Sequence, residues 1–235
     1  MVVEVSVTFE ERLAAVRGRI EKACASAGRS PDDVLLLAVT KGVDPDLITL
    51  AVREGLDVFG ESKVQEARQK IGMCPGNLSW HMIGHLQSNK VKAAVRLFAM
   101  IHSVDSLELL RLVAAACEDA GRSMPVCIEV NISGEGSKYG LPEAEVERVI
   151  VAANDLFRVE VRGLMAIPPV TEKPEDSRQY FRRLREIRDR LRQSTGVELP
   201  ELSMGMSHDF DIAIEEGATI IRVGATLFGK REKKT

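Results

Sequence analysis

A regular alternation of short apolar runs with amphipathic helical stretches constrains the fold more than any other feature of the 235 residues. The first run, residues 34–39, is continuously apolar, which is typical of a strand buried on both faces of a parallel sheet. Helical stretches separate the runs, so the chain favours consecutive βαβ units. The eight predicted strands occupy residues 34–39, 56–60, 78–84, 100–103, 124–132, 159–167, 199–204 and 219–224.

Eight such units, preceded by one extra helix over residues 7–27, predict an α/β fold: a single (β/α)₈ TIM barrel with an additional N-terminal helix. The alternative, an open doubly wound sheet, would need a glycine-rich turn after an early strand. The first strand instead runs into Thr40-Lys41-Gly42-Val43. Because no change in composition marks a second domain, we expect one domain over 1–235, with the helix within 1–30 and the barrel within 34–229.

Composition excludes several classes of function. The net charge of −3 gives no reason to expect nucleic acid or an anionic membrane as a partner. No apolar run is long enough to span a bilayer, and the first residues do not form a secretory signal. Four scattered cysteines without CxxC spacing predict reduced thiols and no metal site. We therefore expect a cytoplasmic protein. The basic run 230–234 and the arginines of the helix that begins at Pro174 are interpreted as solvated surface rather than as sites for acidic partners.

Functional groups of such barrels lie at the carboxyl ends of the strands, and Lys41 lies at the end of the first one. Alternation places Lys41 on the face of Leu37 and Val39. If that face points into the barrel, desolvation would lower the pKa of the amine, and a neutral amine can form a Schiff base with an aldehyde. The alternative is a lysine that extends from the strand end into water.

The connections after the last two strands combine glycines, hydroxyls and an arginine. Ser207 stands where a helix N-cap would stand, so it is either an ordinary cap or part of an anion site. Arg222 shares a strand face with Gly224, and we expect this face to point into the barrel. Thr226 adds a hydroxyl to the same connection. Loops after strands seven and eight form the recurrent phosphate site of these barrels. Closure of the barrel makes this phosphate site a neighbour of Lys41. Pyridoxal 5′-phosphate (PLP) carries both an aldehyde and a phosphate, so this one ligand would satisfy both features.

Seven stretches, in the right order and covering residues 36–229, resemble one known family. They are LAVTK (37–41), FGESKVQE (59–66), WHMIGHLQSNK (80–90), NIS with SKYG (131–133 and 137–140), GLMAIP (163–168), SMGMS (203–207) and RVG (222–224). The chain resembles the pyridoxal phosphate homeostasis protein family, whose barrel is related to the N-terminal domain of alanine racemases.

The resemblance implies that Lys41 carries the aldimine, that Ser207, Gly224 and Thr226 hold the phosphate, and that Arg222 faces the pyridine nitrogen. Ser62 stands where the family usually has Asn, which leaves any contact made by that Asn in question. Lys63, where an aromatic residue is common, is a second departure.

Two further residues have competing interpretations. His81, counted here among the cofactor-binding candidates, lies in the middle of a predicted strand, where a hydrogen-bonded structural histidine is at least as reasonable as an acid or base. Lys138 lies in a loop rich in glycine and serine. It is either a solvated lysine or a second amine that reaches the cofactor when the loop closes.

The expected function is binding, buffering and delivery of PLP inside the cell, with no catalytic residue assigned. Racemisation needs two proton-transfer groups and a strong electron sink, and an arginine at the pyridine nitrogen weakens that sink. Related racemases also supply a tyrosine from a second domain, which we do not expect here. We expect a monomer that passes PLP to apo-enzymes. The alternatives are a PLP-dependent racemase or related amino-acid-transforming enzyme, and a lyase or aldolase barrel that uses Lys41 directly on a phosphorylated sugar.

Overall fold

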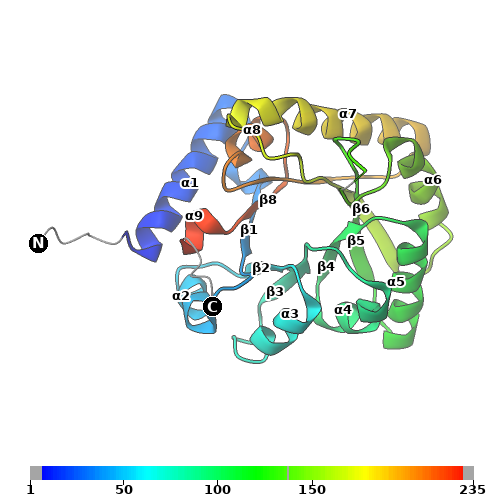
Figure 1. Ribbon diagram of the computed structural model, residues 1–235, viewed down its shortest axis with the longest axis horizontal. Helices are drawn as coiled ribbons and strands as arrows, with labels where there is room; N and C mark the ends of the chain where they lie inside the picture. Colours follow the sequence, from blue (N-terminus) through cyan, green and yellow to red (C-terminus); the bar gives the residue numbers. More distant parts are fainter. Residues whose placement is uncertain (1–6, 137, 230–235) are drawn as a thin grey trace, which may run out of the picture.

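Eight parallel strands close into a barrel in the computed structural model, which describes residues 7–136 and 138–229 (Figure 1). The strands follow one another around the barrel in chain order, and β8 pairs with β1 to close it, with Leu37 opposite Arg222. The predicted TIM barrel is therefore confirmed. The strands are β1 (Leu35–Val39), β2 (Val58–Glu61), β3 (Ser79–Met82), β4 (Met100–Val104), β5 (Met124–Glu129), β6 (Val159–Met165), β7 (Glu201–Met206) and β8 (Ile220–Val223).

Helices surround the barrel and begin close to the predicted positions. They are α1 (Phe9–Ser26), α2 (Pro45–Arg53), α3 (Val64–Ile71), α4 (Val91–Leu97), α5 (Leu107–Ala120), α6 (Glu143–Ala153), α7 (Arg178–Thr195), α8 (Phe210–Glu215) and α9 (Ala225–Phe228). Local chemistry explains several ends. The Thr8 hydroxyl accepts the Glu11 N–H in a capping box, Asp44 caps α2, and Gly121 ends α5 with φ +65°.

Some predicted boundaries were wrong. The fifth and sixth strands stop at Glu129 and Met165, several residues early, because the chain turns into long loops at the barrel end. The helices expected from Ser88 and Pro174 each begin with a 3₁₀ turn. The short helix α9, directly after β8, was not predicted.

The extra helix α1 packs against α8 and α9, where the chain leaves β7 and β8. The Arg12 Nε donates to the Leu227 carbonyl at 2.7 Å, and Phe9 stacks on Phe228 with ring centroids 5.6 Å apart. Arg19 pairs with Asp211 and lies over the Phe210 ring. The N-terminal helix thus supports the connections that contain the candidate phosphate site.

Two apolar clusters form the core. The larger lies between strands and helices, and the smaller fills the barrel with Leu37, Val39 and five other side chains. The face of Leu37 and Val39 therefore points into the barrel, the condition set for it above. A second set of inward side chains is polar, and it includes His102, Ser203 and Arg222, all buried.

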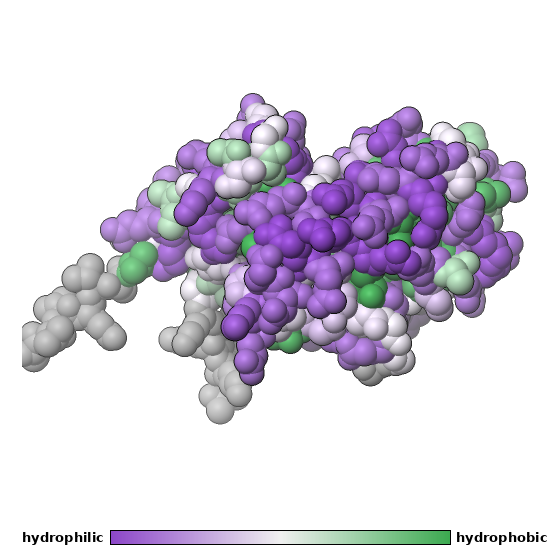
Figure 2. Space-filling view, turned by 90° about the horizontal axis from the view of Figure 1, so that it is seen from above, coloured by the Kyte–Doolittle hydropathy of each residue, from purple (hydrophilic) through white to green (hydrophobic). Residues whose placement is uncertain are grey.

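The arginines of α7 form part of a mainly hydrophilic surface, which Figure 2 shows from the α7 side of Figure 1. Many of them pair with acids on neighbouring elements. Buried Glu216 lies within 3.2 Å of Arg178, Arg182 and Arg185. In residues 7–136 and 138–229, no helix is long and apolar enough to cross a membrane. The basic run 230–234 lies outside the described residues.

Candidate functional site

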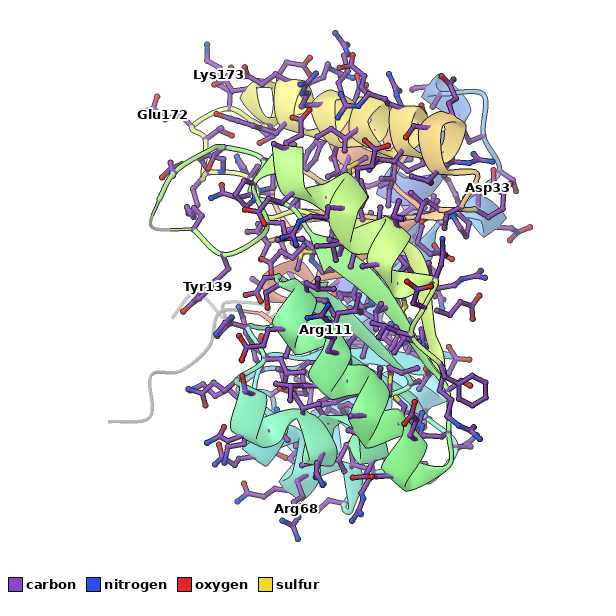
Figure 3. The ribbon with its side chains drawn as sticks, turned by 90° about the vertical axis from the view of Figure 1, so that its right-hand side faces the viewer. Asp33, Arg68, Arg111, Tyr139, Glu172 and Lys173 are labelled. Atoms are coloured by element: carbon purple, nitrogen blue, oxygen red, sulfur yellow. The ribbon has the colours of Figure 1, made fainter. Side chains whose placement is uncertain are left out.

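The barrel has two polar ends. Parallel strands bring the carboxyl ends of all eight strands to one end, where the loops are long, and this end is called the mouth. Figure 3 shows Tyr139 on a loop at the mouth and Asp33 at the opposite end. Five of the seven predicted cofactor-binding residues lie at or near the ends of β1, β2, β7 and β8 that face the mouth: Lys41, Ser62, Ser207, Gly224 and Thr226.

Lys41 lies two residues beyond the end of β1, in a turn. Its side chain is exposed, so the structure does not support the expected desolvated amine. The strand ends at Val39, and this is the reason for the difference: Lys41 has already left the apolar interior. Exposure keeps the amine accessible to a ligand that enters the mouth.

Ser207 joins the two connections that were predicted to hold a phosphate. Its Oγ accepts the N–H groups of Gly224 and Thr226 at 3.3 and 3.4 Å, and its carbonyl accepts the Thr226 hydroxyl. Ser207 does not cap α8, which corrects one of the two interpretations. Asp209 is the N-cap residue of α8, and its carboxylate accepts the Met206 N–H. Hydroxyls and backbone N–H groups from two loops therefore converge within a few ångströms.

Gly205 allows a close backbone approach on the side of α8. A Cβ at this residue would lie 2.5 Å from the Ala213 Cβ, and its φ is +90°. The glycine therefore serves the packing of α8 against β7. It brings the Ser207 turn close to the helix that begins at Phe210.

Arg222 crosses the barrel interior and is 4% exposed. Its guanidinium donates to the Ser203 carbonyl at 2.6 Å, to the Ser203 Oγ at 2.7 Å and to the Ala166 carbonyl at 2.9 Å. Burial lowers the pKa of Arg222 to about 10, so it remains a cation at neutral pH. Three of the five N–H groups of the guanidinium make these bonds.

A chain of hydrogen bonds continues from Arg222 across the barrel. The Ser203 Oγ lies 2.8 Å from His102 Nδ1, His102 Nε2 lies 3.0 Å from His81 Nδ1, and His81 Nε2 lies 3.3 Å from the Ser79 Oγ. A guanidinium only donates, so Ser203 accepts from Arg222 and is satisfied when its own hydroxyl donates to His102. Each histidine then carries its proton on Nε2, and the chain is polarised away from Arg222.

Both histidines are neutral at physiological pH. Burial lowers the pKa of His81 to about 4, and burial with the nearby charge of Arg222 holds the pKa of His102 well below its usual range. The chain of hydrogen bonds requires both imidazole rings to be neutral, because each ring must accept on one nitrogen and donate from the other.

The structure places His81 away from Lys41 and Ser207. His81 lines a cavity of about 1040 Å³ at the opposite end of the barrel, together with the first residues of β1, β4, β7 and β8. It reaches Arg222 only through His102 and Ser203. Of the two interpretations, the geometry favours the hydrogen-bonded structural histidine.

Three inward residues were missed by the sequence reasoning: His102, Ser203 and Glu129. Glu129 ends β5, and burial followed by repulsion from Asp105 raises its pKa to about 7, against the attraction of Arg222. Ser203 begins the matched stretch SMGMS, so it was visible as a motif but not as a partner of Arg222. His102 and Glu129 could have been found as polar side chains within the apolar strands β4 and β5.

Loops at the mouth hold the remaining candidates. The Tyr139 ring stacks on His85 with centroids 4.0 Å apart, and His85 Nδ1 lies 3.0 Å from Asp105. Lys138 precedes Tyr139 in this loop, and its carbonyl lies 3.4 Å from the Asn131 amide. Ser62 follows β2 and is half-buried. Its backbone packs against Gly84 so closely that a Cβ at Gly84 would lie 2.4 Å from the Ser62 carbonyl oxygen. The residues that the structure describes contain no cluster of three metal-binding side chains.

Comparisons with known proteins agree with this architecture. The family model of the alanine racemase N-terminal domain matches residues 12–232. A pyridoxal phosphate homeostasis protein of Aquifex aeolicus is 45% identical over 94% of this chain and 98% of its own length. One from Pseudomonas aeruginosa is 39% identical over 96% of each chain.

Solved structures give the same result. The structure of PipY from Synechococcus elongatus without PLP superposes with a TM-score of 0.86 at 36% identity, and it covers 94% of this chain and 100% of PipY. PipY with PLP bound gives a TM-score of 0.83 at the same identity and coverage. An alanine racemase of Clostridium difficile, 13% identical with a TM-score of 0.74 over 95% of this chain and 58% of its own, shares the fold alone. The chain therefore belongs to the pyridoxal phosphate homeostasis protein family, within the group of barrels that match the alanine racemase N-terminal domain.

Proposed function

We propose that this protein binds PLP through Lys41 and acts in the intracellular homeostasis of that cofactor, by buffering and delivery. The observation that carries the proposal is the pairing of β1 with β8, which brings the turn after β1, with Lys41, beside the connection after β8, where Gly224 and Thr226 bond Ser207. An amine and an anion site that are neighbours match the aldehyde and the phosphate of one small molecule.

The residues at the mouth fit the cofactor group by group. Lys41 would hold the aldehyde carbon of PLP covalently through its amine, with release of the aldehyde oxygen as water. The N–H groups of Gly224 and Thr226, which now make long bonds to Ser207, can donate to phosphate oxygens. The guanidinium of Arg222, which only donates, is suited to the pyridine nitrogen. When bound, PLP supplies an electron sink.

Several features favour a carrier over an enzyme. A guanidinium beside the pyridine nitrogen leaves that nitrogen unprotonated, which weakens the electron sink that racemisation needs. Arg222 is already anchored by Ser203 and Ala166, so its position is fixed. Tyr139 is 60% exposed and stacked on His85, and Tyr180 is half-buried on α7, so neither is placed as a buried proton donor at Lys41. The runner-up is a PLP-dependent enzyme that transforms amino acids, for which buried Glu129 offers a titratable group near Arg222.

The finer parts of the proposal concern the whole protein. We propose that it works as a single domain, as a monomer in the cytoplasm, and that apo-enzymes dependent on PLP receive the cofactor. The contacts of α1 with α8 and α9 support one folding unit.

The experiment is an absorption spectrum of the purified protein with added PLP, compared with that of Lys41→Ala. A visible band in the wild type that is absent from the variant supports the proposal, and a colourless wild type contradicts it and favours an aldolase-like barrel. Incubation with single L-amino acids followed by chiral analysis then separates the two PLP-dependent functions. Efficient turnover would exclude a pure carrier.

A further inference from the structure

A buried ionic cluster lies directly behind the turn of Lys41. Lys70 on α3 is 7% exposed. Its Nζ lies 2.7 Å from Glu61 Oε1 on β2 and 2.6 Å from Glu66 Oε1 on α3. The same Nζ donates to the carbonyl of Thr40, whose hydroxyl bonds Glu61 Oε1 at 2.7 Å. Three charged side chains from β2 and α3 therefore meet at Thr40, the residue that precedes Lys41.

Glu66 makes a second contact, on the far side of Lys41. Its Oε1 accepts the N–H of Gly42 at 2.5 Å. The Thr40 carbonyl and the Gly42 N–H belong to the two peptide groups that flank the Cα of Lys41. Because both peptide planes are held by one helix, the backbone dihedral angles of Lys41 are fixed, and with them the direction in which its side chain leaves the chain. Gly42 permits this turn with φ +71°.

Stability alone does not explain the cluster. Burying the Glu61 carboxylate and the Lys70 ammonium, with Glu66 partly buried beside them, has a large desolvation cost that their attraction offsets only when every group is well bonded. Among the residues that the structure describes, Glu61 Oε2 is buried without a hydrogen-bond partner. Burial raises the pKa of Glu61. Apolar side chains would fill the same space between α3 and β2 at less cost, so the charges serve the backbone groups that they hold.

We propose that Glu66 and Lys70 are positioning residues for Lys41, because they hold the two peptide groups on either side of it and so direct its amine toward a ligand bound at the mouth. This inference rests on the proposed function. It concerns the approach of the amine to the aldehyde and leaves the phosphate site unaffected.

The test measures the rate of PLP capture, from growth of the visible band, in the wild type, Glu66→Ala and Glu66→Gln. Alanine removes the acceptor of the Gly42 N–H, and we expect capture to slow by about tenfold or more, since misplaced reacting groups lose rates of this order. Glutamine retains an oxygen for Gly42, so it should restore most of the rate. Affinity for pyridoxamine 5′-phosphate, which has no aldehyde but keeps the ring and phosphate, should remain at the wild-type value in both variants.

Glu216→Gln is the control, because it also alters a carboxylate with several partners, but on the α7 side of the barrel. It should lower stability without slowing capture. Lys70→Met tests the other proposed positioning residue. If this variant does not fold, the result for Glu66→Ala decides whether the inference holds.

Three results would overturn the inference. Capture at the wild-type rate by Glu66→Ala and by any folded Lys70→Met would exclude a positioning role, and so would an equal loss of affinity for PLP and for pyridoxamine 5′-phosphate. Both results leave the proposed function intact. A wild-type protein that shows no band overturns the proposed function and the positioning role with it.

Discussion

The two ends of the barrel differ in how their polar groups are used. At the mouth, Lys41 is exposed, and the N–H groups near Ser207 make bonds of 3.3–3.4 Å that a better acceptor can replace. At the opposite end and in the interior, the polar groups already have short partners, as in the chain from Arg222 to His81. The difference indicates that the interior chain stabilises the fold, whereas the mouth retains groups for a ligand. Substitutions in the interior chain should therefore lower stability, whereas substitutions at the mouth should lower affinity for PLP.

The largest expected effect on stability comes from Arg222→Met. This change leaves the Ser203 hydroxyl and two buried carbonyls without their donor, and we expect a loss of about 3 kcal/mol in the free energy of unfolding. Chemical denaturation without ligand measures it. A loss below about 1 kcal/mol would show that the interior chain contributes little to stability.

Acid should weaken the interior chain of hydrogen bonds through His81. His81 has a pKa of about 4 in the folded protein, below its ordinary 6.5, so the unfolded chain binds the proton first as pH falls. The stabilisation is complete above pH 6.5 and is lost between that pH and about 4, by at most about 1.4 kcal/mol per pH unit. Thermal or urea unfolding across this range should show the slope, and His81→Gln should reduce it. An unchanged slope in that variant would contradict the assignment.

Ser207→Ala sharpens the comparison at the mouth. It removes only long, half-exposed hydrogen bonds, so stability should change by less than about 0.5 kcal/mol. The variant also loses a hydroxyl beside the proposed phosphate, and we expect affinity for PLP to fall by roughly tenfold, the equivalent of one charge-assisted hydrogen bond. Titration of the visible band measures this. A large loss of stability with unchanged affinity would reverse the roles assigned to the two regions.

The smallest effect is expected at the end opposite the mouth. Glu201 lines the cavity there and accepts the Thr219 hydroxyl at 2.7 Å. Glu201→Gln keeps an acceptor, so stability should change by less than about 0.5 kcal/mol and PLP affinity should not change. A fall in PLP affinity would show that the cavity beside Glu201 is coupled to the mouth, so that the two ends of the barrel do not act independently.

Local patterns were sufficient to predict most of the fold. The alternation of apolar runs and helical stretches specified the order of the elements and the barrel. Motifs at strand ends also identified Lys41, Ser207 and Arg222 as candidates, because a parallel barrel brings those ends together.

Contacts across the closed barrel could not be predicted in this way. His102 meets Ser203, 101 residues away, and no local periodicity encodes that distance. The choice between a cap and an anion site stayed open for Ser207 because its partners Gly224 and Thr226 come from the next unit. The helix α9 was missed because it has four residues, too few for a helical pattern. The exposure of Lys41 depended on where β1 ends, and strand ends are set by pairing with neighbours rather than by composition.

The most direct test of the central claim is reduction of the PLP-treated protein with borohydride, followed by mass spectrometry of its peptides. The account predicts loss of the visible band and a phosphopyridoxyl mass on the peptide that contains Lys41, with no such mass in Lys41→Ala. A stable modification on another lysine of the wild type, or none at all, would contradict it.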